Sequence, residues 1–228
     1  MNHLDREILL LLNGLIGRSR ILFEAALLLC GSLPLVASVM TWMALWWSRE
    51  AVRHPTGLLV GTVPEGSSSA SCAGRRCCVA LAAGASVAVM ATRILAAGME
   101  GTRPLAREDL LVPMDTAAWR DLVQVMTGFG AFPSDHAALF FAMALGLFAW
   151  GRRLGMMGLA AAVLLCTARV AVGFHYPFDM VAGGLLGGGS AWFFMRMVRH
   201  SPGFFDTVVD LFTRYPAIFY PCLFLVCL

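Results

Sequence analysis

The chain has 228 residues, of which 59% are hydrophobic and 14% are charged, and its formal net charge is +3. An ordinary soluble domain is excluded, because about a quarter of the residues in such a domain are charged. The mean hydropathy of +0.75 agrees with this exclusion. The chain has no basic stripe typical of nucleic-acid-binding proteins, so we expect no nucleic-acid partner. The composition indicates an integral membrane protein with the bilayer as its surroundings.

Apolar runs close to the ~20 residues that cross a bilayer as a helix recur along the chain. We expect spans at residues 21–47, 77–97, 136–150 (with an apolar lead-in from 128), 154–174, 177–198 and, as a short last run, 215–228. A single strand cannot span a bilayer, and no alternating barrel pattern is present. The sequence therefore predicts an all-α fold, an integral membrane helical bundle of about six transmembrane helices.

The segment before the first span, residues 4–16, begins with polar residues and continues as an apolar run. It lacks the basic opening and the cleavage site of a signal peptide, so we interpret it as a short amino-terminal interfacial helix.

The arginines predict the orientation of the bundle, and the chain has no lysine. One side carries arginine in all three of its segments, at 48–76, 151–153 and 196–214. The other side mixes arginine with acidic residues in the loop at 98–130, although Arg6, Arg18 and Arg20 also lie on it. By the positive-inside rule the first side is cytoplasmic, and the second faces outward.

Three polar clusters fall on the outward side. They are GTRPLARED at 101–109, FPSDHA at 132–137 and ARVAVGFHYPFDM at 168–180. Ionisable groups at membrane depth cost several kcal/mol unless they are paired or hydrated, and such groups are functional candidates by default. Three such clusters on one side predict a single site.

The third cluster predicts a histidine held at the start of a helix. Pro177 suits the first turn, which makes Tyr176 the cap and places Asp179 at the third helical position, near the positive end of the dipole. Asp179 is then expected to bind one imidazole nitrogen of His175, leaving the other as a nucleophile or base. Arg169, about two turns back in the preceding helix, could clamp phosphate oxygens with its guanidinium fork.

The second cluster, FPSDHA, predicts another helix start. Pro133 and Ser134 open the helix, so the backbone N–H groups of Ser134, Asp135 and His136 are expected to lack intrahelical partners and to form an anion site. His136 is placed to donate a proton to a leaving group. Two histidines, arginines and two helix starts in one pocket favour phosphoryl transfer. No acidic cluster suited to magnesium accompanies them, so we expect no metal and no cofactor.

Three motifs in this order carry a family resemblance. They are Arg103-Pro104, Pro133-Ser134-x-His136 and Arg169-x5-His175-x3-Asp179. With this spacing the chain resembles the type 2 phosphatidic acid phosphatase superfamily of membrane lipid phosphatases, whose soluble relatives include vanadium haloperoxidases. The resemblance covers roughly residues 93–190, which we interpret as the catalytic core of a single membrane phosphatase domain spanning 1–228.

The resemblance implies a role for each motif residue. It implies that His175 forms a phosphohistidine, that Asp179 orients it and that His136 is the general acid. The phosphate-binding residues that it implies are Arg103, Ser134 and Arg169.

Two features narrow the substrate that the resemblance implies. Asp135, where many members have glycine, is similar to the bacterial undecaprenyl diphosphate phosphatases of this superfamily, and it is either a substrate contact or a residue that favours the helix dipole. The stretch LNGL at 12–15 points the same way. We therefore expect a polyprenyl diphosphate substrate, undecaprenyl diphosphate, in the inner membrane of a bacterium, with the site on the periplasmic or outer face.

One departure from the family is plain. Its first motif begins with a lysine, and counting back from Arg103 places Ala96 at that position. Arg93, one helical turn earlier, either reaches the same phosphate or extends to the interface at a helix end. Arg107, Glu108 and Asp109, which follow in the same loop, are interpreted as a solvated loop face.

Several alternatives remain open from the sequence. The substrate could be another lipid phosphate: phosphatidylglycerol phosphate, phosphatidic acid or lipid A. The protein could also be a lipid phosphotransferase, or an inactive lipid-binding member. The glycine-rich run GGLLGGG at 183–189 favours close helix packing within the bundle over the seam of a homodimer.

Overall fold

The computed structural model describes residues 3–47, 68–99, 102–114, 116–127 and 130–216, and those residues form helices without any strand. In chain order the elements are α1 (His3–Ile16), α2 (Arg20–Cys30), α3 (Leu33–Trp47), α4 (Ser68–Ala97), the short 3₁₀ turn η1 (Pro104–Ala106), α5 (Ala117–Thr127), α6 (Asp135–Leu147), α7 (Arg152–Val172), α8 (Pro177–His200) and α9 (Pro202–Arg214). The predicted all-α fold is confirmed for this part of the chain.

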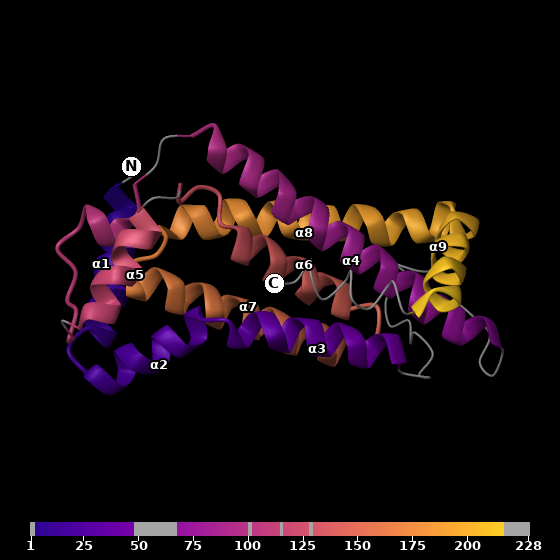
Figure 1. Cartoon of the computed structure of the whole chain (residues 1–228), viewed down its shortest axis with the longest axis horizontal. Coiled ribbons are helices and arrows are strands. Elements are labelled where there is room, and N and C mark those ends of the chain that lie inside the picture. The colour runs from indigo at the N-terminus through magenta and orange to yellow at the C-terminus, as the bar shows by residue number, and fades with distance from the viewer. Residues whose placement is uncertain (1–2, 48–67, 100–101, 115, 128–129, 217–228) are drawn as a thin grey trace.

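The long helices run side by side along the molecule, with α6 at their centre (Figure 1). Helix α6 packs against α4, α7 and α8, while α2 packs against α7 and α3 packs against α4. Helices α1 and α5 lie at one end of the bundle and α9 lies at the other (Figure 1). The starts of α6 and α8 and the end of α7 all meet at the α1–α5 end.

Among the described residues, two helical segments are long and apolar enough to cross a membrane. They are residues 73–97 of α4 and the whole of α7. Helices α2 and α3 meet it only together, with a bend of 43° between them. The predicted single span at 21–47 is therefore a bent pair, because Gly31 and Ser32 interrupt the helix and Pro34 suits the first turn of a new one. Helix α6 has only 13 residues, since it begins at the cap Ser134. The predicted count of about six spans is not confirmed, and the last predicted run, 215–228, lies almost wholly outside the described residues.

Two segments interpreted as loops contain amphipathic helices. In the loop predicted to face outward, α5 packs Trp119, Leu122 and Met126 against a core that includes Phe23 and Val172. At the opposite end, α9 packs its inner face onto the α3–α4 region. Its buried residues are Phe205 and Val209, beside Trp46 and Cys77. Both helices close an end of the bundle.

The glycine run of α8 brings its backbone close to α6. A Cβ at Gly183 would collide with the carbonyl oxygen of Ser134, and one at Gly187 would collide with that of Ala138. Gly189, in contrast, has open space beside it. The predicted packing within the bundle is therefore confirmed for Gly183 and Gly187, and it fixes the start of α6 against α8. The homodimer seam stays a prediction.

Candidate active site

His175 lies in the short connection between α7 and α8, almost fully buried at 3% exposure. Helix α7 ends at Gly173, whose φ of 92° is one that glycine adopts readily. Helix α8 then begins with Tyr176 as its cap and Pro177 in the first turn, as predicted. The histidine is thus held between two helix ends.

The partners of the His175 ring settle which nitrogen carries the proton. Nδ1 lies 2.9 Å from the carbonyl oxygen of Ala131, which only accepts hydrogen bonds, so Nδ1–H is the donor. Nε2 lies 3.2 Å from Nη1 of Arg103, which only donates, so Nε2 carries a lone pair. Burial lowers the pKa of His175 below its ordinary value, and the nearby charge of Arg103 acts in the same direction. The ring is therefore a neutral imidazole whose Nε2 carries the lone pair.

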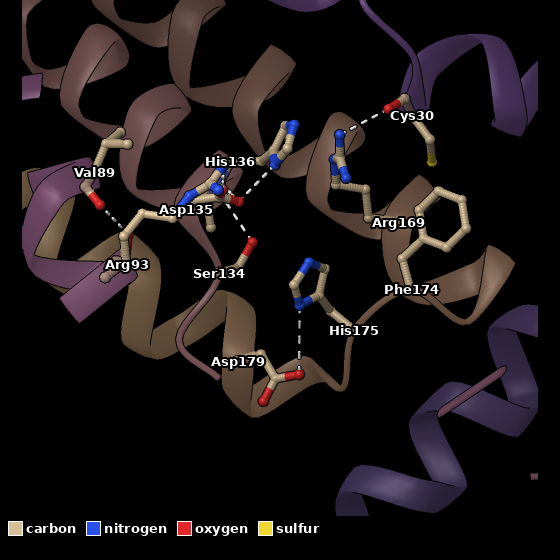
Figure 2. Close-up of polar contacts among 12 residues, drawn as sticks. Cys30, Val89, Arg93, Ser134, Asp135, His136, Arg169, Phe174, His175 and Asp179 are labelled. Atoms are coloured by element: carbon tan, nitrogen blue, oxygen red, sulfur yellow. Dashed lines mark hydrogen bonds and ion pairs between the residues drawn. The ribbon is translucent and has the colours of Figure 1, made fainter. Parts of the chain in front are cut away.

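Asp179 stands beside this histidine and organises the start of α8. Its Oδ2 is 3.6 Å from Nδ1 of His175 (Figure 2). The same oxygen accepts a 2.8 Å hydrogen bond from the backbone N–H of Tyr176. The direct imidazole partner is instead the Ala131 carbonyl, which sequence reasoning missed because a backbone group leaves no signal in the residue types. Asp179 thus contributes negative charge near His175 and a cap for the helix.

Arg103 is held by backbone oxygens from helix α5 and from the connection between α7 and α8. Its Nε donates to Met126 at 2.8 Å, and its Nη1 donates to Phe174 at 3.0 Å besides approaching His175. The side chain is 9% exposed, and burial lowers the pKa of its guanidinium. These bonds place a cation at the nucleophilic nitrogen of the histidine.

Ser134 caps α6, and its Oγ accepts from the N–H of Ala137 at 3.3 Å. Its own N–H donates to the carbonyl of Asp179 at 3.1 Å. The N–H of His136 donates to Oδ1 of Asp135 at 2.8 Å. The N–H groups of Ser134 and His136, predicted to lack intrahelical partners, are thus bonded to the α8 backbone and to the Asp135 side chain instead.

Arg169 approaches from the last turn of α7 and is 3% exposed. Its Nη2 donates to the carbonyl of Cys30 at 2.7 Å, at the end of α2 (Figure 2). Its Nε is buried and has no hydrogen-bond partner among the described residues. A buried donor in this state is costly, and an anion placed beside it would satisfy it.

The second histidine belongs to a chain of polar contacts that ends on α4. Nδ1 of His136 is 2.7 Å from Oδ1 of Asp135, and Oδ2 of Asp135 is 2.6 Å from Nη2 of Arg93 (Figure 2). The structure thus connects Arg93 to the predicted cluster through Asp135. The predicted residues all gather at the α1–α5 end.

A second layer behind His175 involves the amino-terminal helix. Oε1 of Glu108 accepts from the Tyr176 hydroxyl at 3.2 Å, and Oε2 pairs with Nε of Arg6 at 2.7 Å. The Glu108 side chain is only 5% exposed, so the interpretation of a solvated loop face is wrong for this residue. Oδ1 of Asp5 accepts from the N–H of Phe178 at 2.9 Å. The polar residues that open the apolar helix α1 are the sequence signal for this layer.

Comparison with curated proteins finds three partial relatives. The chain is 41% identical over 63 residues to the bacitracin transport permease protein BcrC of Bacillus licheniformis, which covers 28% of this chain and 31% of that protein. It is 42% identical over 59 residues to the putative undecaprenyl-diphosphatase YbjG of Escherichia coli, covering 25% and 29%. It is 38% identical over 81 residues to the lipid A 4'-phosphatase of Bacteroides thetaiotaomicron, covering 32% and 36%.

These matches span about a third of each relative's own length. No solved structure matches the chain significantly. The model of the PAP2 superfamily matches residues 77–202, which contain α6, α7, α8 and the three polar clusters. Since that match covers more than half of the 228 residues, and its motifs are the ones just located, the chain belongs to the PAP2 superfamily.

Proposed function

We propose that this protein is a membrane lipid phosphatase that removes the terminal phosphate of a polyprenyl diphosphate, undecaprenyl diphosphate in particular, through a phosphohistidine. The observation that carries the proposal is the neutral His175, whose Nε2 lone pair lies beside Arg103. The unsatisfied Nε of Arg169 adds a second cationic donor at the same end of the bundle. Membership of the PAP2 superfamily supports the reaction class.

In the first step, Nε2 of His175 attacks the terminal phosphorus, and the bond from phosphorus to the bridging oxygen breaks. His136 gives its proton to that oxygen, which leaves as the lipid monophosphate. Arg103, Arg169 and the hydroxyl of Ser134 stabilise the charge on the transferring phosphoryl group.

In the second step, a water molecule attacks the phosphohistidine and gives a proton to His136. The bond from phosphorus to Nε2 breaks, inorganic phosphate leaves and both histidines return to their starting state. Asp179 favours the positive charge that His175 carries in the phosphorylated form. The steps balance without a metal or a cofactor.

The location is part of the same proposal. We infer a bacterial inner membrane, about six spans in all and a site on the outer face. The described parts of the arginine-rich segments, 68–76, 151–153 and 196–214, support this orientation, because they lie toward the α9 end and the site lies at the α1–α5 end (Figure 1).

Phosphate release by the purified protein in detergent with EDTA tests the proposal. We expect release from undecaprenyl diphosphate by the wild type and a loss of about 10³-fold or more in His175→Ala, as expected when a covalent nucleophile is removed. Equal and slow release by both proteins would contradict hydrolysis. The phosphohistidine is tested by quenching in alkaline SDS, which preserves the bond from phosphorus to nitrogen: ³²P should be trapped on the wild type but not on the variant.

A second candidate substrate class follows from the similarity to a lipid A 4'-phosphatase. A panel of undecaprenyl diphosphate, phosphatidylglycerol phosphate, phosphatidic acid and lipid A in the same assay compares kcat/KM directly. Phosphate transfer to an added lipid acceptor in place of water would identify a phosphotransferase. Binding of lipid phosphate without any turnover would identify an inactive lipid-binding member.

A further inference from the structure

Asp135 connects the second histidine to a cation on another helix. Its Oδ1 accepts from both the backbone N–H and the ring Nδ1–H of His136, at 2.8 and 2.7 Å. Its Oδ2 pairs with Arg93 of α4 at 2.6 Å. Both carboxylate oxygens of Asp135 therefore already have partners from the protein, and none of these partners belongs to a substrate.

The contact from Asp135 decides which nitrogen of His136 can exchange a proton with substrate. A carboxylate oxygen only accepts, so Nδ1 of the ring keeps its hydrogen while it is bonded to Asp135. Proton donation and recovery are then confined to Nε2, the same atom in both steps. A histidine with one nitrogen held in this way is both oriented and restricted to one tautomer.

Arg93 neutralises the negative charge that Asp135 places near the phosphate site. A carboxylate near a phosphate site repels the incoming anion unless a cation neutralises it. The Asp135 side chain is 19% exposed, whereas that of Arg93 is 66% exposed and reaches it from the outside of the bundle. The pair is neutral as a unit, so the phosphate site keeps the positive charge of Arg103 and Arg169.

We propose that Asp135 is a positioning residue that holds His136 for proton transfer through Nε2, and that Arg93 acts through Asp135 rather than on the substrate phosphate. This inference rests on the proposed function, and it replaces the expectation that these two residues bind phosphate. Arg93 thereby differs from the family lysine in role as well as in position.

Leaving-group dependence separates positioning of an acid from a general structural effect. An alkyl phosphate needs a proton on its departing oxygen, whereas a nitrophenyl phosphate does not. We therefore compare two first-turnover rates: release of the lipid alcohol from a lipid phosphate monoester, such as the phosphatidic acid of the panel above, and the burst of nitrophenolate from a nitrophenyl phosphate monoester with an alkyl chain on its ring. Use of the first turnover for both substrates keeps the second step, which also needs His136, out of the comparison.

We expect Asp135→Ala to resemble His136→Ala. Each variant lowers the first-turnover release of the lipid alcohol from the lipid phosphate about 100-fold or more, which is the scale of general acid catalysis. Each leaves the nitrophenolate burst within about fivefold of the wild type. Asp135→Asn, whose amide oxygen still accepts from Nδ1–H, recovers part of the loss. Asp121→Asn, which removes an exposed carboxylate of α5, is the matched control and stays at the wild-type rate. Equal loss on both substrates in Asp135→Ala would overturn the inference.

A double-mutant cycle tests the role of Arg93. If Arg93 acts through Asp135, Arg93→Met lowers kcat in the wild type and changes nothing further in Asp135→Ala. Arg93→Lys, which can still form the ion pair, restores most of the activity. Independent effects, or a rise in KM alone, would instead identify Arg93 as a phosphate ligand and overturn this part. Absence of any nitrophenolate or phosphate release by the wild type would refute the proposed function itself, which is a separate outcome.

Discussion

Ser134 donates its backbone N–H to the carbonyl oxygen of Asp179 at 3.1 Å, so the two helix starts that carry the histidines are joined through their main chains. The bond exists because Gly183, one turn further along α8, leaves room for the α6 backbone. The spacing of the helix starts that carry His175 and His136 is thus set by backbone packing rather than by flexible side chains.

A methyl group at Gly183 should separate these two helices. In Gly183→Ala the new Cβ collides with the Ser134 carbonyl, a rigid backbone atom, and we expect a loss of about 1–3 kcal/mol in the free energy of unfolding. Thermal unfolding in detergent and phosphate release should both decline. Gly189→Ala is the control, because open space surrounds that position and helix propensity alone favours alanine there. A Gly183→Ala protein as stable and active as the control would contradict the packing.

The acid limb of the activity profile should report the buried nucleophile. Burial lowers the pKa of His175, so its reactive neutral form persists below the ordinary histidine pKa of about 6.5. The nitrophenolate burst, which does not need the acid His136, should hold steady as the pH falls to about 6.5 and decline only at lower pH. Rapid-mixing measurements between about pH 4 and 8 would show this. A midpoint above the ordinary value would mean that the ring is stabilised in its charged form.

Loss of the Glu108 carboxylate should loosen the amino-terminal helix from the site. Glu108→Ala removes the partner of both Arg6 and the Tyr176 hydroxyl. Burial, followed by the charge of Glu108, raises the pKa of Tyr176 to about 12, so this hydroxyl stays a donor at neutral pH. We expect faster tryptic cleavage at Arg6 and Arg18 and a lower Tm.

Glu7→Ala is the matched control for that experiment. Its carboxylate is 61% exposed and lies 3.4 Å from His3 of the same helix, so cleavage should proceed as in the wild type. Unchanged cleavage in Glu108→Ala would show that α1 is held by its apolar contacts alone.

Replacement of Arg169 by lysine should weaken anion binding more than stability. Lysine keeps the positive charge and can reach the Cys30 carbonyl, but it has no counterpart of the unsatisfied Nε. We expect the inhibition constant of vanadate, a phosphoryl mimic, to rise about tenfold, the scale of one charge-assisted hydrogen bond. Inhibition curves with and without vanadate measure it. A large drop in Tm with unchanged vanadate affinity would assign Arg169 a purely structural role.

Local chemistry made the helix starts predictable from the sequence. Pro177 and Tyr176 place Asp179 at the third helical position, and Ser134 caps α6, because proline and capping residues act within a few neighbours along the chain. The same locality explains why the histidines could be recognised from spacing alone. Their membership in one site followed from the expectation that all outward clusters lie on one side.

Contacts that depend on how the helices pack were not predictable in this way. The Ala131 carbonyl on His175 and the Cys30 carbonyl on Arg169 are backbone groups, which any residue type could supply. The pairing of Arg93 with Asp135 depends on the packing of α4 against α6. Helix α5 was missed because its 11 residues mix charged and apolar side chains, so that its charges suggested a loop.

The contact between Arg103 and Nε2 of His175 has a consequence for selectivity. In this arrangement the lone pair on Nε2 of His175 accepts a hydrogen bond from Arg103, so it is not available to a neutral electrophile that enters from the bilayer. Only an anion offers the guanidinium a better partner than the imidazole, and its arrival frees the nitrogen at the moment a phosphorus atom is within reach.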